Sequence, residues 1–591
     1  MSNVNAQSTE ARLPEGFYEH NGRLFFHDET GEKEILVSNQ SLVPVVKACN
    51  KNQNANWHIM LHCINHSGAE VEINICLKQA KMNIDPVISH LAGSGVFIQN
   101  KRYFMSFIEA SCGLDLPVYR VATQAGFQPD GELIFMYGFT PVFAPENVDF
   151  HGVVPAESMK VNESVEISGL LDDWKLRVAG KVQGFAPKLS ILIGLSSPLL
   201  FFIGESGALF HLAGHSSTGK TVALQLCASV NGPAAEPGSG ALTGIQRWNA
   251  TSNGLETLLA SSNNTTLCVD ELGSFAGKNF SYVLYDAVSG KSKVRMNVES
   301  FGRAVESTWS QNVLSTGELT IEERIRQDKR SAQDGQLHRS LSIQITAEDS
   351  RGEGESAEAA RQRIGEIKSN LLSCYGSAGY EFVRCLTGLL DDSDKALGWH
   401  QTVECLKDAY RIRTKELTCR LQANQIELTE VENRAWDRFA ILYLTGVLAM
   451  EWGILPWSNE EILDVVYVAF TRWLNNFRNA ENSKENILSG VQNYLGTQET
   501  KFHDAKIPRP GVVKADTVGY RLKDGCFLVL PDALEKLSEN WGLNAKKLAQ
   551  MIDAAGYLVR PESDRLTMRK AINGANVTGY CINSAFTSAK F

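Results

Sequence analysis

Residues 214–221 read Gly-His-Ser-Ser-Thr-Gly-Lys-Thr, and this stretch decides the fold class. It matches the phosphate-binding template G-x-x-x-x-G-K-S/T at every fixed position. The apolar run 208–213 before it predicts a buried strand, and residues 222–228 after it predict a helix. A loop in this setting points backbone N–H groups at phosphate oxygens, and the helix N-terminus adds the positive end of a dipole. A nucleoside triphosphate is therefore the expected ligand, and a chance loop rich in Gly and Ser is the weaker interpretation.

The phosphate loop also predicts two cofactors, ATP and Mg²⁺. In this template the Lys220 ammonium reaches the β- and γ-phosphates, and the Thr221 hydroxyl is a ligand of Mg²⁺. The residues expected to hold the nucleotide are Gly214, Ser216, Ser217, Thr218, Gly219, Lys220 and Thr221.

A second motif, residues 265–271 (TTLCVDE), predicts an apolar strand that ends in two acidic residues. Asp270 is expected to hold Mg²⁺, directly or through water. Glu271 is placed to polarise the attacking water as a general base. The adjacent glutamate favours an ATP-hydrolysing motor over a GTP switch and disfavours a scaffold without turnover. An ordinary acidic strand end is the alternative interpretation.

Two further polar residues are candidates for catalysis. A polar residue that ends a strand between the phosphate loop and the acidic pair would sense the γ-phosphate, and Thr316 is the expected one, with Glu318 beside it. Arg339 precedes the last predicted core strand, Leu341 to Ile345. In ring ATPases an arginine at this position points into the neighbouring subunit's nucleotide and stabilises transition-state charge. A surface arginine or a salt bridge is the alternative.

A basic window at residues 289–296 (SGKSKVRM) lies between the acidic pair and the predicted sensor strand. Lys291, Lys293 and Arg295 alternate in it, so on a hairpin strand they would share one face. Such a face could line the central channel of a ring and grip the phosphates of single-stranded DNA. A solvated loop is the alternative.

Length and composition limit the classes of protein. The 591 residues suffice for about three or four domains. A formal net charge of −10 excludes a protein coated in basic surface, so contacts with DNA are expected to be local. The twelve cysteines form no CxxC pair and predict reduced thiols. The first residues lack the apolar core of a signal peptide, and residues 189–213 predict a core helix plus strand rather than a membrane span. We expect a cytoplasmic protein with no membrane contact.

The pattern along the chain predicts an α/β fold with five segments. Strand and helix signals alternate around the phosphate loop, which implies a parallel sheet. A helical interruption is expected near Gln40 to Asn50, and a polar linker at residues 478–486. His58, His62 and His66 recur every four residues, but no carboxylate or thiol completes a zinc ligand set. The expected segments are a disordered tail at 1–13, a β-rich domain at 14–150, a P-loop ATPase core at 151–350, a helical lid-like region at 351–480 and a winged-helix-like module at 487–591.

Several of these sequence segments resemble those of a known family, the helicase-like ATPases grouped as domain of unknown function family 927. These proteins are carried by staphylococcal cassette elements and prophages. The resemblance rests on residues 207–221 and on Leu314 to Glu318 (LSTGE), and more loosely on residues 453–457 and 556–558. It implies an AAA+ ATPase core similar to that of self-loading replicative helicases, with a winged-helix-like C-terminal module. The segment Gly184 to Lys188 differs from the family's usual Gly-Asn-Ser-Arg pattern, so no arginine role is carried over there.

The resulting hypothesis is an ATP-dependent DNA helicase or translocase of a mobile genetic element or prophage. A trans-acting Arg339 needs a neighbouring subunit, so a homo-oligomeric ring is expected, with a hexamer as the favoured size. Single-stranded DNA is the expected partner in the channel, and duplex DNA is a further candidate at the C-terminal module. The alternative is an ATP-driven switch or remodelling ATPase, for example in phage defence, that does not unwind DNA. Stimulation of ATP hydrolysis by single-stranded DNA distinguishes the two.

Overall fold

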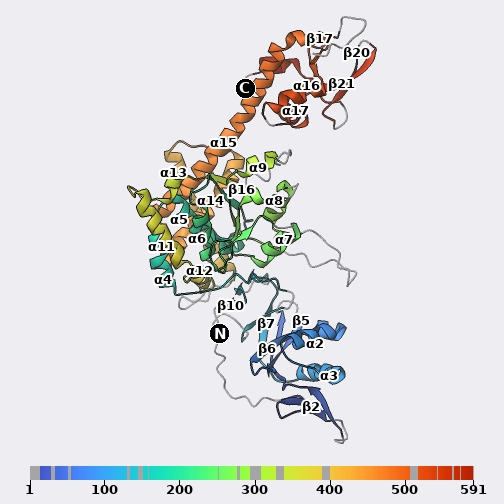
Figure 1. Cartoon of the computed structure of the whole chain (residues 1–591), viewed down its shortest axis with the longest axis vertical. Coiled ribbons are helices and arrows are strands. Elements are labelled where there is room, and N and C mark those ends of the chain that lie inside the picture. The colour runs from blue at the N-terminus through green and yellow to red at the C-terminus, as the bar shows by residue number, and fades with distance from the viewer. Residues whose placement is uncertain are drawn as a thin grey trace.

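The phosphate-loop segment lies in a five-stranded sheet at the centre of the computed structural model (Figure 1). All the strands of this sheet are parallel, and the P-loop strand β12 has β15 on one side and β16 on the other. In spatial order the strands are β13 (Gln246–Arg247), β14 (Leu267–Asp270), β15 (Val313–Gly317), β12 (Leu209–Ala213) and β16 (Ser340–Gln344). The mixed α/β class predicted from the sequence is confirmed.

The structure describes most of the chain. The described residues are 13–27, 33–50, 55–129, 133–143, 151–156, 159–249, 252–275, 280–292, 308–327, 339–388, 399–505, 517–541, 543–561, 565–572 and 574–589.

Both faces of the central sheet are buried, as a parallel sheet requires. Successive residues of β12 point to opposite faces: Leu209 packs with one apolar cluster, while Phe210 and Leu212 pack with another. The first cluster contains residues from α7 (Ser252–Ser261), α8 (Phe280–Ser289) and α9 (Ile321–Gln327). The second contains residues from α5 (Phe185–Ile203), α6 (Lys220–Ser229) and α14 (Glu430–Glu451).

Helix α5 is the most apolar helix in the described part of the chain. It is long and apolar enough to cross a membrane, yet 83% of its apolar window is buried inside the protein. It packs against α6 and α14, among others. The prediction that residues 189–213 form a core helix followed by a strand is therefore confirmed.

The N-terminal part of the molecule forms a separate body beneath the central sheet in Figure 1. Its main sheet has the order β11 (Val153–Pro155), β7 (Val118–Ala122), β4 (Val43–Asn50), β5 (Ala55–Ile64) and β6 (Glu70–Cys76). Three helices pack with it: α1 (Leu77–Met82), α2 (Asp85–Gly93) and α3 (Lys101–Ser111). A small antiparallel sheet of β1 (Phe17–His20), β2 (Arg23–His27) and β3 (Glu34–Ser38) completes it. A second small antiparallel sheet, β8 (Gly126–Phe127), β9 (Phe135–Tyr137) and β10 (Thr140–Val142), packs instead into the core that contains α5 and α6.

The helix expected near Gln40 to Asn50 is wrong, because β4 occupies most of this segment. Strand β4 pairs with β5 on one side and with β7 on the other. Its residues alternate between partly exposed and buried over most of its length. Three valines favour an extended chain, and Pro44 cannot lie inside a helix without loss of a hydrogen bond.

A helical region follows the central sheet. Two short elements, α4 (Leu171–Arg177) and the 3₁₀ helix η2 (Ala179–Lys181), precede the P-loop core, and a further 3₁₀ helix, η4 (Ala347–Ser350), follows β16. The long helices after it are α11 (Ala357–Asn370), α12 (Ser377–Gly388), α13 (Trp399–Ala423), α14 and α15 (Asn459–Thr497).

The polar linker expected at residues 478–486 is wrong, because α15 runs through it as one continuous helix. This stretch is polar, but it contains neither Gly nor Pro, so it does not interrupt a helix. Apolar residues on either side of it join two different cores. Phe470 and Trp473 belong to the core beside the central sheet, and Leu488 and Val491 belong to that of the C-terminal part.

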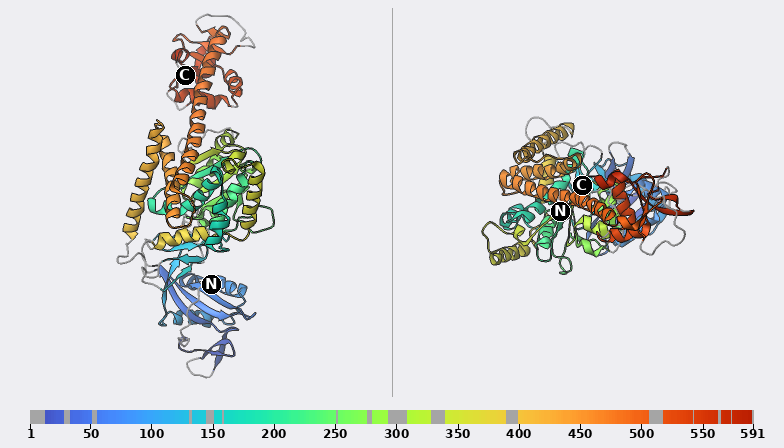
Figure 2. Two further views of the ribbon diagram at one scale, coloured as in Figure 1. Left: turned by 90° about the vertical axis from the view of Figure 1, so that its left-hand side faces the viewer. Right: turned by 90° about the horizontal axis from the view of Figure 1, so that it is seen from above.

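The C-terminal part lies at the far end of α15, remote from the N-terminal part (Figure 1), and Figure 2 shows the same elongated arrangement from the side. Its sheet has the order β17 (Phe502–Asp504), β18 (Gly519–Arg521), β19 (Phe527–Val529), β21 (Ala575–Ile582) and β20 (Met568–Ile572). Two helices, α16 (Pro531–Glu539) and α17 (Ala545–Ala554), pack against the end of α15 and this sheet. The 3₁₀ helices here are η5 (Glu499–Lys501) and η6 (Ser584–Ser588).

Candidate nucleotide-binding site

The phosphate loop, residues 214–219, connects the end of β12 to the start of α6. A Cβ atom on Gly214 would lie 2.6 Å from the Ile345 carbonyl oxygen, and one on Gly219 would lie 2.4 Å from Ser350 Oγ. Gly219 also has φ of +91°, in the left-handed region that favours glycine. Both fixed glycines of the motif are therefore required by close packing against the chain that follows β16.

The amide groups of the loop are available to an anion. Within the described residues, the N–H groups of residues 215–219 donate no hydrogen bond to the protein. The Thr218 hydroxyl donates to the carbonyl oxygen of His215 at 2.9 Å, which fixes the turn from inside. A concave loop of unsatisfied N–H groups at a helix N-terminus is a phosphate-binding arrangement, so the loop fits ATP.

In this structure the Lys220 side chain folds back onto the phosphate loop. Its Nζ donates to the carbonyl oxygens of Gly214 at 2.5 Å and of His215 at 2.7 Å. Partial burial lowers the pKa of Lys220, whereas the nearby carboxylates, Glu318 first, act to raise it. A bound phosphate group that replaced the two carbonyl oxygens would place a full negative charge beside this ammonium.

The acidic strand end and the predicted sensor residue lie together. Strand β15 is between β12 and β14, which is the position that the sensor hypothesis requires. The Thr316 hydroxyl donates to Asp270 Oδ1 at 2.6 Å, and the backbone N–H of Glu271 lies 3.4 Å from Thr316 Oγ1. The structure therefore brings Thr316, Asp270 and Glu271 to one edge of the sheet, beside the phosphate loop.

Glu271 has an unusual backbone conformation. Its φ of +56° is left-handed, which for a residue other than glycine costs on the order of 1 kcal/mol. Its side chain is exposed, and the 3₁₀ helix η3 (Leu272–Ser274) follows it directly. Such strain is concentrated at functional sites, and here it turns the Glu271 side chain away from the buried strand.

The chemistry of the oxygen ligands fits Mg²⁺. The Thr221 hydroxyl at the start of α6 and the Asp270 carboxylate are hard oxygen donors, and Mg²⁺ keeps several waters beside one or two such protein ligands. No group of three or more His, Cys, Asp or Glu side chains suited to a metal occurs among the described residues. His58 and His66 instead contact Asn74 and the Gly95 carbonyl, respectively.

Glu318 is a third carboxylate at the site. Its Oε1 accepts a hydrogen bond of 2.8 Å from the hydroxyl of Ser216, which is itself part of the phosphate loop. This places a negative charge against the loop that is expected to bind a triphosphate. Glu318 would therefore compete with a bound phosphate for the same side of the loop.

A buried histidine beneath the site was missed by the sequence analysis. His211 lies in the middle of β12 and is fully buried. Its Nε2 is 2.9 Å from the Leu319 carbonyl oxygen, which can only accept, so Nε2 carries the proton. Its Nδ1 then accepts from the Ser315 hydroxyl at 3.0 Å, and Ser315 accepts in turn from Trp248 Nε1 at 2.8 Å.

Burial lowers the pKa of His211 to about 4, so this histidine is neutral near pH 7. The hydrogen bonds fix the backbone on either side of Gly317 and Glu318. The signal in the sequence was a single polar residue inside the apolar strand Leu209–Ala213.

An ion pair from the helical region also borders the loop. Arg472 of α15 donates to both carboxylate oxygens of Asp349, at 2.7 and 2.6 Å, and its guanidinium stacks over Phe185. Burial acts to raise the pKa of Asp349, but the bonds from Arg472 and Thr346 outweigh it and hold the pKa below its usual value. The next residue, Ser350, is the one that approaches Gly219. This pair therefore fixes α15 against the phosphate loop.

Arg339 lies away from the nucleotide site of its own chain. It precedes Ser340, which is paired with Leu209 at the beginning of β12, whereas the phosphate loop follows the other end of that strand. A strand of five residues is about 17 Å long. Arg339 Nε is buried and has no hydrogen-bond partner among the described residues.

The basic window is only partly described. The Gly290 carbonyl accepts a hydrogen bond from the Trp309 N–H, and Lys291 pairs with Thr308 in an antiparallel bridge. The two ends of the segment between them therefore lie side by side. Lys293 and Arg295 lie outside the described residues.

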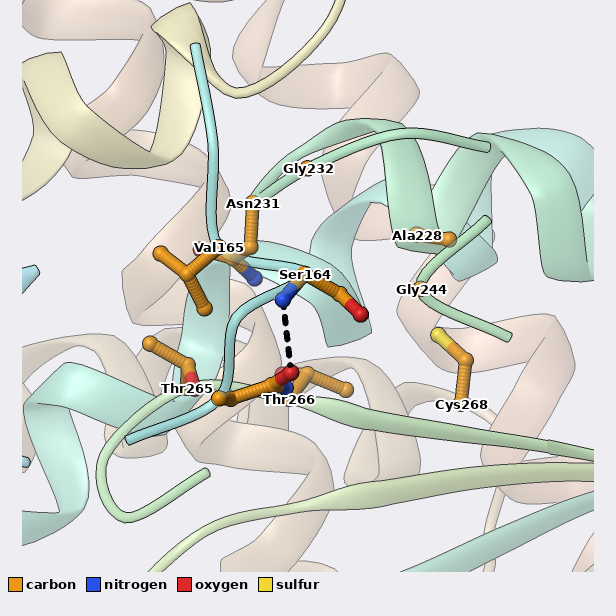
Figure 3. Close-up of a pocket in the computed structure, with 10 residues that line it drawn as sticks. Ser164, Val165, Ala228, Asn231, Gly232, Gly244, Thr265, Thr266 and Cys268 are labelled. Atoms are coloured by element: carbon orange, nitrogen blue, oxygen red, sulfur yellow. Dashed lines mark hydrogen bonds between the residues drawn. The ribbon is translucent and has the colours of Figure 1, made fainter. Parts of the chain in front are cut away.

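A small cavity lies at the opposite end of β14 from Asp270 (Figure 3). Its volume of about 20 Å³ has room for roughly one water molecule. Thr265, Thr266 and Cys268 of the β14 segment line it, together with Ser164 and Asn231. A cavity of this size cannot hold a nucleotide, so the phosphate loop is the candidate site.

Comparisons with known proteins give a family and a fold. Residues 15–307 match the model of a protein family described as Domain of unknown function (DUF927). No curated protein matches the chain. A solved structure described as "SCCmec type IV Cch - active helicase" is similar with a TM-score of 0.61 at 16% sequence identity, covering 97% of this chain and 98% of that chain. The likeness shows a common fold over nearly the whole length.

The first prediction concerns Glu271. Replacing Glu271→Gln should leave ATP binding intact and lower the rate of hydrolysis by about a hundredfold or more, because the amide cannot accept the proton of water. Nucleotide titration and single-turnover phosphate release measure the two effects. Loss of Mg²⁺-dependent ATP binding in this variant would instead make Glu271 a metal ligand, which is the result expected for Asp270→Asn.

The second prediction concerns Glu318. Replacing Glu318→Gln keeps an acceptor for Ser216 and removes the charge, so the affinity for ATP should rise by roughly threefold to tenfold, and the affinity for ADP should rise less. Titration with both nucleotides measures this, and Glu358→Gln on α11 is the control for loss of one exposed carboxylate. Equal changes for ATP and ADP would show that Glu318 does not face the γ-phosphate.

Proposed function

We propose that this chain, which belongs to the DUF927 family over residues 15–307, is an ATP-dependent DNA helicase or translocase of a mobile genetic element or prophage. One observation carries the proposal: the phosphate loop with Lys220, the acidic pair and Thr316 converge at one edge of a parallel sheet. The fold shared with a structure described as an active helicase supports it. A cytoplasmic location is part of the same proposal.

Each residue of the site has a proposed role in ATP hydrolysis. The amides of the loop and Lys220 would bind the phosphates, and Thr221 and Asp270 would hold Mg²⁺, which neutralises phosphate charge when bound. Glu271 would orient a water molecule and accept its proton, since its carboxylate is exposed beside Asp270. Thr316, which is hydrogen-bonded to Asp270, would sense the γ-phosphate from the neighbouring strand.

We assign the central sheet to an AAA+ core. An additional strand, β15, separates the P-loop strand from the acidic strand, and the helical region packs over α5 and α6 as a lid. The proposed parts are a β-rich N-terminal domain at 14–150, the AAA+ core at 151–350, the lid at 351–480 and a winged-helix-like domain at 487–591.

The position of Arg339 favours a ring. Because it lies at the opposite edge of the sheet from the phosphate loop of its own chain, it cannot stabilise charge there. A neighbouring subunit in a closed ring could present its nucleotide to this edge, and a hexamer is the size proposed. The buried Nε without a partner in the described residues supports a role for Arg339 in an assembly.

The basic window would contact single-stranded DNA. The antiparallel pairing of Lys291 with Thr308 brings the two ends of the intervening segment together. In a ring the basic side chains of this window would line the channel and bind phosphates without reading sequence.

An unwinding assay tests the proposal. Full-length protein with ATP and Mg²⁺ should separate a forked DNA substrate, and single-stranded DNA should stimulate its ATP hydrolysis. The Lys220→Ala variant should do neither, because the phosphates lose their cation. Robust ATP hydrolysis that responds to no DNA and unwinds none would favour the alternative, an ATP-driven switch or remodelling ATPase.

The third prediction tests the trans role of Arg339. The Arg339→Ala variant should lose roughly a hundredfold or more in ATP hydrolysis. Mixing it with Lys220→Ala protein should partly restore activity, since one subunit supplies the arginine and the other the intact loop. Hydrolysis rates across mixing ratios measure this. If subunits exchange and no mixture gains activity, Arg339 has a structural role.

The fourth prediction concerns the basic window. Replacing Lys291, Lys293 and Arg295 together by alanine should weaken single-stranded DNA binding and lower its salt slope by about 2. Hydrolysis without DNA should remain, because the phosphate loop is elsewhere in the chain. Fluorescence anisotropy at several salt concentrations measures the slope. An unchanged slope would leave this window as a solvated loop.

A further inference from the structure

A chain of buried hydrogen bonds crosses the central sheet on the face opposite the candidate catalytic groups. Side chains alternate along each strand, so Leu209 of β12 packs on the α7 and α8 side of the sheet and Leu314 of β15 on the α5 and α6 side. His211 and Ser315, which are paired in register, therefore lie on the α7 and α8 side. Thr316 lies on the other side, where α6 begins at the phosphate loop.

The chemistry of its members fixes the direction of this chain. It begins at the Trp248 indole, which can only donate, and it ends at the Leu319 carbonyl oxygen, which can only accept. Between them the Ser315 hydroxyl accepts from Trp248 and donates to His211, and the neutral imidazole donates onward through Nε2. Each of these groups has one proton to give, so a single arrangement satisfies all of them. A buried network that is fully satisfied is rigid.

His211 holds the segment 315–319 from both ends through its two hydrogen bonds. Gly317 lies in the middle of this segment and directly beside the imidazole, because a Cβ atom there would be 3.1 Å from His211 Cε1. The same Cβ atom would be 3.0 Å from the Cβ of Leu272, the residue that follows Glu271. The imidazole and the chain after the acidic pair therefore enclose Gly317 from two sides.

The same segment makes the contacts that join the parts of the candidate site. The Thr316 hydroxyl donates to Asp270 Oδ1. The Gly317 carbonyl oxygen accepts from the N–H of Gly214, where the phosphate loop begins, at 3.1 Å. A shift of this segment would therefore move Thr316 relative to the acidic pair and the loop. A displacement of about 1 Å can cost about a hundredfold in the rate of a catalysed reaction.

Trp248 ties the start of the chain to the acidic strand. Its backbone N–H donates to the Asp270 carbonyl oxygen at 3.2 Å, while its indole N–H donates to Ser315. Its ring packs edge-on against Phe275 and Phe280 in the buried cluster behind the sheet. This one residue therefore sets the spacing between the ends of β14 and β15.

We propose that His211 is a positioning residue for ATP hydrolysis. Through this chain of hydrogen bonds it keeps the Thr316 hydroxyl against Asp270, and Ser315 and Trp248 serve the same purpose. All three side chains lie behind the sheet, so they act through Thr316 and not on the nucleotide. The inference rests on the proposed function only for the hydrolysis of ATP, because it requires no DNA.

A second buried hydrogen bond between an indole and a serine gives a matched control. Trp174 Nε1 donates to Ser229 Oγ at 3.2 Å, and both residues are fully buried. Ser229 ends α6, about 14 Å along the helix from the phosphate loop. The variants Ser315→Ala and Trp248→Phe each remove one bond of the chain, and Ser229→Ala and Trp174→Phe make the same chemical changes in the control.

Hydrolysis of ATP by the full chain without DNA is the measurement, under single-turnover conditions. Ser315→Ala and Trp248→Phe should lower its rate by roughly tenfold or more, because the Thr316 hydroxyl is no longer held in place. Their affinity for ATP should stay within about threefold of the wild type, since the phosphate loop is intact. The control variants should change neither quantity by more than about twofold, although thermal unfolding should show a similar loss of stability in all four.

A double variant tests whether the chain acts through Thr316. Adding Ser315→Ala to Thr316→Val should lower the rate no further, because the contact that the chain positions is already absent. His211→Asn, whose amide oxygen can accept from Ser315, should retain more activity than His211→Leu, which offers no acceptor.

Two results would overturn the inference alone. One is an equal rate in Ser315→Ala and Ser229→Ala. The other is a loss from Ser315→Ala that is as large in the Thr316→Val background as in the wild type, which would make the chain a structural element only. A wild-type protein that binds ATP without hydrolysing it would contradict the proposed function itself, and the inference with it.

Discussion

The parallel arrangement of β12, β15 and β14 is the constraint on which the site depends. Parallel strands present their carboxyl ends at the same edge, so three segments that are separated by about fifty residues each in the chain end beside one another. The loop after β12 supplies amides and Lys220, β15 supplies Thr316, and β14 supplies the acidic pair. The hydrogen bond between Thr316 and Asp270 joins two of these strands directly. The order β14, β15, β12 places Thr316 between the phosphate loop and the acidic pair.

The sequence allowed the prediction of the motifs at this edge but not of the contacts that hold them. The strand and helix around residues 214–221 followed from hydrophobic runs, because local pattern dominates there. His211 was missed because a lone polar residue in an apolar strand has no meaning until its partners, Ser315 and Leu319, are known. Arg472 was missed for the same reason, since Asp349 is more than a hundred residues away in the chain.

Two errors in secondary structure have different causes. The segment now seen as β4 was expected to be helical, although its valines favour an extended chain once β5 and β7 are available as partners. The segment 478–486 was expected to be a linker because it is polar, although polar residues without Gly or Pro can continue a helix between two cores. In β4 the local signal of Pro44 and three valines already disfavoured a helix, whereas in α15 tertiary packing into two cores decided the conformation.

The continuity of α15 means that two cores share one rigid rod. Arg472 fixes this rod beside the phosphate loop, and Leu495, 23 residues further on, is buried in the C-terminal core, about 35 Å away along the axis. A tilt of about 10° at the ion pair would displace the far end by about 6 Å, close to the rise of two base pairs in a duplex. At this length, an ångström-scale rearrangement beside the phosphate loop would become a displacement of several ångströms at the C-terminal core.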